Sequence, residues 1–91
     1  MAHLTDQNET LLKRVRRIRG QLEAVERALL EAKDCGTVLH LTAAAKGAIG
    51  GLIDEIIASH LQEHVARPGL GDRARAQGAE ELLMAIKRYG K

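Results

Sequence analysis

The sequence is short of aromatic residues and proline: Tyr89 is its one aromatic side chain and Pro68 its one proline, among 91 residues. Leucine, isoleucine, valine and alanine must therefore fill any core, which favours packing of helix on helix. β-Branched residues nowhere alternate with polar ones over the length of a strand, so no strands are expected. No run approaches the roughly 18 apolar residues of a membrane span, and the N-terminus lacks the basic-then-apolar layout of a signal peptide. We expect an all-α, cytoplasmic protein without membrane contact.

Cysteine is equally scarce, with Cys35 alone. A single cysteine cannot form an internal disulfide, and in a reducing compartment it stays a thiol that is available for chemistry. A chain of this length makes one domain at most and buries a modest core by itself. We therefore expect one domain over residues 1–91 that forms oligomers.

Apolar spacing predicts a first helix from Thr5 to about Lys33, with Thr5 or Asp6 as its N-cap. Its apolar residues follow the alternating four and three spacing of a heptad seam: Leu11, Val15, Ile18, Leu22, Val25 and Leu29. The segment Asp34-Cys35-Gly36 is expected to break this pattern.

A second periodic segment runs from Thr37 to about Ala66. At about 1.5 Å per residue this helix would be roughly 45 Å long, so we expect it to pack against a copy of itself. Gly47, Gly50 and Gly51 would let another backbone approach closely. After a turn, Asp72 is expected to cap a last helix from Arg73 to about Arg88. The protomer is thus expected to have three helices with a long central one.

His60 and His64 stand four residues apart, which places both imidazoles on one helical face where they can share a metal ion. The alternative is a pair of histidines on a solvated helix end. With Glu63 they also match the His-x-x-Glu-His signature of a zinc peptidase class. We reject a hydrolase, because such enzymes need a distant third ligand and a cleft, and 27 residues follow His64.

Cys35 is a candidate soft ligand near the start of the second helix, although a lone cysteine is more often a small apolar filler. It lies 25 positions before His60 on one predicted helix, about 37 Å away, so the two cannot bind one ion within a chain. In an antiparallel pair of long helices, Cys35 of one protomer would face His60 and His64 of its partner. The metal site would then be built twice across the dimer interface.

Five of the seven residues from Lys13 to Arg19 are basic, and none is acidic. They are expected on the face of the first helix that the seam leaves free. Such clusters are often solvated surface, but this one would repel itself without an anionic partner, and DNA phosphate is the obvious candidate. The residues expected to bind DNA are Lys13, Arg14, Arg16, Arg17, Arg19, Gln21 and Lys46. A purely structural or metal-storing helical bundle is the remaining alternative.

Along nearly its whole length the chain resembles a family of repressors that sense copper, nickel and cobalt, or formaldehyde. The resemblance rests on the segment from Arg14 to Gln21, on Cys35, on Lys46-Gly47-Ala48 and on the pair His60 and His64. It implies a three-helix protomer, an antiparallel dimer and a disc-shaped tetramer. It also implies a non-enzymatic protein that binds double-stranded promoter DNA, is released by its effector, and represses efflux or detoxification genes.

Residue types within this family imply the effector. Copper sensors resemble a Cys-His-Cys pattern, and here His64 stands where the second cysteine would be, which disfavours Cu(I). The nickel and cobalt branch is similar in carrying an N-terminal histidine with Cys, His and His, here His3, Cys35, His60 and His64. The amine of Ala2 can add a ligand once the initiator methionine is removed. Ni(II) or Co(II) is the implied effector, and Zn(II) also suits such N/S ligands.

The formaldehyde branch is the rival, because its first helix looks very similar to this one. It uses the cysteine that matches Cys35 together with an N-terminal proline amine. Here Ala2 replaces that proline, and His64 is a ligand that aldehyde chemistry does not need. Both differences favour a metal, although a primary amine and a thiolate can also condense with an aldehyde.

Overall fold

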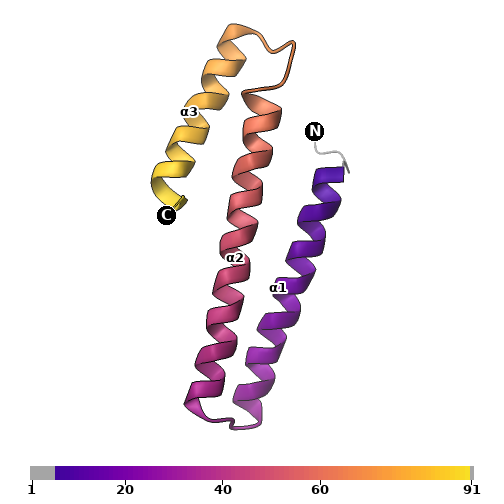
Figure 1. The fold of residues 1–91 in the computed structure, drawn as a ribbon, viewed down its shortest axis with the longest axis vertical. Coiled ribbons are helices and arrows are strands. Elements are labelled where there is room, and N and C mark those ends of the chain that lie inside the picture. Colours follow the sequence, from indigo (N-terminus) through magenta and orange to yellow (C-terminus); the bar gives the residue numbers. More distant parts are fainter. Residues whose placement is uncertain (1–5, 91) are drawn as a thin grey trace. The chain divides into compact units, whose positions relative to one another are not determined.

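A computed structural model describes residues 6–90 of the chain (Figure 1). Within that range it contains three α-helices and no strand: α1 is Asp6–Leu30, α2 is Cys35–His64 and α3 is Asp72–Tyr89. The all-α class and the long central helix are confirmed. None of these helices combines the length and apolar character that a membrane crossing requires.

The chain divides into two compact units. The first, Met1–Leu52, contains α1 and the first part of α2, which run side by side and are joined by a short turn (Figure 1). The second, Ile53–Lys91, contains the rest of α2 and, alongside it, α3. Helix α2 is continuous through both, and the single domain expected over residues 1–91 stays a prediction.

Helix α1 ends at Leu30, three residues before the predicted end at Lys33. Ala32 has a φ of 53°, in the left-handed region. The backbone N–H of Lys33 donates to the carbonyl of Ala28 at 2.9 Å, and that of Ala32 donates to Leu29 at 3.2 Å. These two bonds form a Schellman motif with an alanine where glycine is usual. The predicted end lies too far along the chain because apolar spacing does not report this reversal of the backbone.

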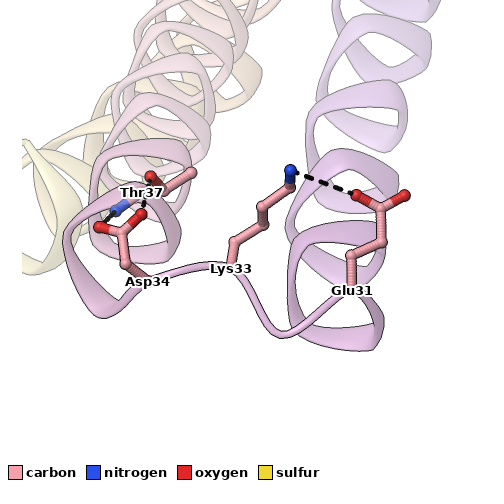
Figure 2. Close-up of polar contacts among 4 residues, drawn as sticks. All are labelled: Glu31, Lys33, Asp34 and Thr37. Atoms are coloured by element: carbon pink, nitrogen blue, oxygen red, sulfur yellow. Dashed lines mark hydrogen bonds and ion pairs between the residues drawn. The ribbon is translucent and has the colours of Figure 1, made fainter.

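Helix α2 begins at Cys35, two residues before the predicted start, because Asp34 is its N-cap (Figure 2). The backbone N–H of Thr37 donates to Asp34 Oδ2 at 3.1 Å, and its hydroxyl donates to Asp34 Oδ1 at 2.6 Å. The hydroxyl bond first, and then the backbone bond, lower the pKa of the Asp34 carboxyl. In the same turn Lys33 Nζ lies 3.8 Å from Glu31 Oε1 (Figure 2).

The guanidinium of Arg75 caps the C-terminal end of α2. Its Nε donates to the carbonyl of Val65 at 2.8 Å and its Nη2 donates to that of Arg67 at 3.0 Å. The helix ends at His64, two residues before the predicted end. The prediction for the start of α3 is wrong, since Asp72 is the first helical residue and Gly71 is an N-cap without a side-chain bond.

Part of the predicted seam on α1 is not buried within this chain. Ile18 and Ala28 are buried, but Val15, Leu22 and Leu29 are 43%, 50% and 62% exposed. The half-buried residues beside Ile18 are instead polar: Arg14 and Gln21. The face that α1 turns toward α2 is therefore displaced from the apolar stripe. One reason is that α2 presents Gly51 to α1, and the Arg14 side chain lies in the space that a side chain there would fill.

Candidate functional site

His60 and His64 lie in the last two turns of α2. Their ring centroids are 4.7 Å apart, and the ring planes are tilted by 42°. The spacing of four residues thus brings the two imidazoles together as predicted. His60 is half-buried, whereas His64 is exposed.

The His60 ring is held by α3. Its Nε2 donates a hydrogen bond to the backbone carbonyl of Gly78 at 3.0 Å, and the same nitrogen lies 3.7 Å from Glu81 Oε1. When Nε2 carries the proton in a neutral imidazole, Nδ1 is the nitrogen that can accept a metal ion. The arrangement matches metal sites in which the second ring nitrogen donates to a carbonyl or carboxylate.

Gly78 is buried and lies against the end of α2. A Cβ atom added there would clash with the backbone carbonyl of His64, so this close approach requires glycine. Gly78 and Glu81 were not predicted as part of the site, since they are 18 and 21 residues beyond His60 in the sequence. A glycine in the middle of a predicted helix was the available signal, because such a residue often marks a close packing contact.

An open pocket of about 280 Å³ adjoins His64 within the second unit. Its lining comes from both helices: His64, Ala74, Gln77, Gly78 and Glu81. His64 therefore borders open space, which leaves room for an ion and for a ligand from elsewhere.

Cys35 is an exposed, free thiol at the opposite end of α2 from the histidines. Among residues 8–90, whose side chains are described, no three histidine, cysteine or acidic side chains are placed so that they could hold one metal ion. A complete site therefore needs donors beyond those described in one chain. The predicted ligands His3 and Ala2 lie outside the described residues. His40 is exposed on α2, away from the pair in sequence.

The basic residues of α1 do not all share one exposed face, contrary to prediction. Exposed side chains are found at four positions of the α1 cluster and at one on α2: Lys13, Arg16, Arg17, Arg19 and Lys46. Arg14 and Gln21 are half-buried toward α2. Gln21 Oε1 is buried without a hydrogen-bond partner among the described atoms. The exposed cations can contact an anionic partner directly, whereas the guanidinium of Arg14 lies against Gly51 of α2.

Comparison with known proteins shows the family. Residues 7–88 match the family model described as metal-sensitive transcriptional repressor. The chain belongs to this family. Its members are repressors and not enzymes, so the metal-dependent hydrolase is excluded, and DNA binding, oligomerisation and a metal effector follow at the level of the family.

The chain is also similar to individual proteins. The repressor's chain is 40% identical over 91 residues to an uncharacterized protein in the bioA 5′ region of Serratia marcescens, with full coverage of both. It is 34% identical to the transcriptional repressor RcnR of Salmonella arizonae, covering 94% of this chain and 93% of the relative.

A solved structure is also similar. It is a glutamate-to-histidine variant of the formaldehyde-responsive regulator FrmR from Salmonella enterica serovar Typhimurium, with a TM-score of 0.87 and 36% identity. The match covers 97% of this chain and 99% of that one, which confirms the fold of the repressor.

Proposed function

We propose that this repressor binds promoter DNA in its metal-free form and is released by Ni(II) or Co(II), with Zn(II) as a further candidate. Release would derepress efflux or detoxification genes. The protein would act in the cytoplasm, where the DNA is.

The histidine pair carries this proposal. His60 and His64 are adjacent in space, and the bond from His60 Nε2 to Gly78 leaves Nδ1 as the ligand atom. Two imidazoles that are already aligned reduce the ordering that metal binding requires. Nitrogen donors together with one thiolate suit borderline ions such as Ni(II), Co(II) and Zn(II) better than Cu(I).

The thiolate would come from Cys35 of a second copy. Cys35 is exposed at the first residue of α2, and the histidines are in its last two turns. Antiparallel pairing of two α2 helices would therefore bring the start of one to the end of the other. His3 and the amine of Ala2 would complete the coordination. Two such dimers would form the disc-shaped tetramer.

DNA would bind to the exposed cations and to the two half-buried polar residues: Lys13, Arg14, Arg16, Arg17, Arg19, Gln21 and Lys46. Metal binding would favour a tetramer shape in which these residues no longer match the duplex. The effect is a coupling free energy, so DNA must in turn weaken metal binding by the same factor.

The test is fluorescence anisotropy of the full chain on a labelled duplex carrying the promoter of its own gene. The titration is repeated at fixed ionic strength with Ni(II), Co(II), Zn(II), Cu(I) and formaldehyde. We expect release by Ni(II) or Co(II). Tight metal binding that leaves DNA affinity unchanged would refute the switch.

His64→Ala tests the site, and His40→Ala is its matched control on the same helix. His64→Ala should weaken metal binding by more than about tenfold, the least that loss of even an outer partner costs. His40→Ala should bind metal and DNA as the unmodified protein does. Equal metal responses of the two variants would remove His64 from the site.

A formaldehyde response is the second candidate, supported by the similarity to FrmR and by the exposed thiol of Cys35. The thiol and the amine of Ala2 would each form a bond to the formaldehyde carbon, giving an N–CH₂–S bridge with loss of one water. Cys35→Ser should abolish either response, whereas His64→Ala should abolish the metal response alone. Release by formaldehyde that survives His64→Ala would assign the protein to the aldehyde sensors.

A further inference from the structure

Arg14 differs from the other cations of α1 in its surroundings. Lys13 and Arg16 on either side of it along the chain are exposed, but Arg14 is half-buried in the first unit. A Cβ atom built on Gly51 would lie 2.9 Å from Arg14 Nη1 and 3.9 Å from Arg14 Cζ. No other atom outside the local helix backbone comes within 4 Å of that point. The guanidinium of α1 therefore occupies a space that exists because α2 has no side chain at Gly51.

The guanidinium of Arg14 has no ion pair or hydrogen bond with the residues whose side chains are described, and none of the carboxylates among those residues neutralises it. A partly desolvated cation with unpaired donors gains when an anion binds to it. The planar, forked donors of arginine match phosphate oxygens, and a side chain confined against a neighbouring helix loses less rotamer freedom when it binds than a fully exposed one. The arrangement is that of a prepositioned phosphate contact.

We propose that Gly51 is a positioning residue for DNA binding, which seats the guanidinium of Arg14 against α2 so that its free donors meet a phosphate. The proposal rests on the proposed role of Arg14 in binding DNA. A methyl group at position 51 would displace the guanidinium from this seat. The clash is with the far end of a flexible side chain, so the helices themselves are not forced apart.

Gly51→Ala tests the seat, and Gly50→Ala is its matched control. Gly50 is the preceding residue of the same helix, and a Cβ there would meet nothing within 4 Å. Both substitutions replace a mid-helix glycine by alanine and gain the same helix propensity. The metal-free full chain is titrated onto the labelled promoter duplex at several salt concentrations. Circular dichroism confirms that both variants are helical, and size-exclusion chromatography confirms that both assemble as the unmodified protein does.

Gly51→Ala should weaken DNA binding about three- to tenfold relative to Gly50→Ala. It should also make the dependence of log K on log salt shallower by up to about one unit, which corresponds to one lost phosphate contact. A general effect on helix stability would not change this slope. Affinities and slopes that are equal for the two variants, or tighter binding by Gly51→Ala, would overturn the proposal.

A double-variant cycle shows whether the effect passes through Arg14. In an Arg14→Ala background, adding Gly51→Ala should change DNA affinity no further. If Gly51→Ala still weakens DNA binding in the absence of the Arg14 side chain, the proposal that Gly51 acts by positioning Arg14 is overturned. If Arg14→Ala alone leaves DNA affinity unchanged, the proposed DNA role of Arg14 fails and the seat fails with it. If Arg14→Ala binds DNA weakly while Gly51→Ala and Gly50→Ala bind it equally well, the positioning role of Gly51 is refuted and the DNA-binding role of Arg14 stands.

Discussion

The backbone carbonyl of His64 occupies the space in which a side chain on Gly78 would begin. Gly78 also accepts the hydrogen bond from His60 Nε2. Gly78 therefore sets both the distance between α3 and α2 and the orientation of His60, a candidate ligand. No rotamer change can relieve a clash with a backbone atom, which makes this position sensitive to the smallest substitution.

Gly78→Ala should destabilise the protein by about 1–3 kcal/mol, because α3 must move away from α2. It should also weaken metal binding by about 10–100-fold, since His60 loses the carbonyl that orients it. Urea denaturation and a metal titration measure the two effects. Gly20→Ala is the control, as a Cβ there meets nothing within 4 Å, and it should stabilise α1 by up to about 1 kcal/mol. Equal stabilisation by both variants would contradict the close approach.

Ala32→Gly should stabilise the protein by about 1 kcal/mol. Ala32 has a φ of 53°, where a Cβ is strained and glycine is not. Ala44→Gly, at an exposed position inside α2, should instead cost about 1 kcal/mol. Thermal denaturation of the two variants should thus show shifts of opposite sign. A loss of stability in both would mean that Ala32 is not left-handed in solution.

The Asp34 cap should make stability depend on pH in the acid range. Because the folded pKa of Asp34 is lowered from 3.8, the cap contributes fully above that ordinary value. The contribution is lost as the pH falls through the lower, folded pKa. Urea midpoints from about pH 6 to about pH 2.5 measure it. Asp34→Asn can still cap α2 and should remove this component of the acid loss, so identical pH profiles for variant and parent would count against the cap.

Arg75→Ala should cost about 1–2 kcal/mol, because the carbonyls of Val65 and Arg67 lose a charged donor at the end of α2. Arg75→Lys should recover little of it, since lysine lacks the forked donors that reach both carbonyls. Arg73→Ala, at an exposed position of the same helix, should change stability by less than about 0.5 kcal/mol. Denaturant unfolding separates these cases, and similar losses for Arg73→Ala and Arg75→Ala would argue against the cap.

Much of the fold follows from the sequence because periodicity is local information. The spacing of apolar residues predicted three helices in the correct order, and the spacing of His60 and His64 predicted their shared face. Helix ends were less predictable. Ala32 carries no sequence signal for a left-handed residue, and Asp34 was assigned to a break although its carboxylate starts α2.

Contacts between helices could not be predicted, because a sequence pattern indicates only which residues share a face of one helix. The polar residues Arg14 and Gln21 take inward positions that the apolar seam assigned to other residues. The carbonyl of Gly78 and the carboxylate of Glu81 reach His60 across a turn. Which side chain meets which depends on how closely two helices approach, and where α3 meets α2 that distance is set by Gly78.

An apolar row on α1 is exposed in the single chain: Val15, Leu22 and Leu29. Its exposure affects how the protein behaves on dilution. In the described part of one chain the buried hydrophobic residues are small in number and size: Ile18, Ala28 and Ala45. So slight a core leaves folding dependent on association, and apparent stability then rises with protomer concentration. Newly made chains would be open to proteolysis until enough copies had accumulated to assemble. Below a minimum cellular concentration, no functional repressor would therefore persist.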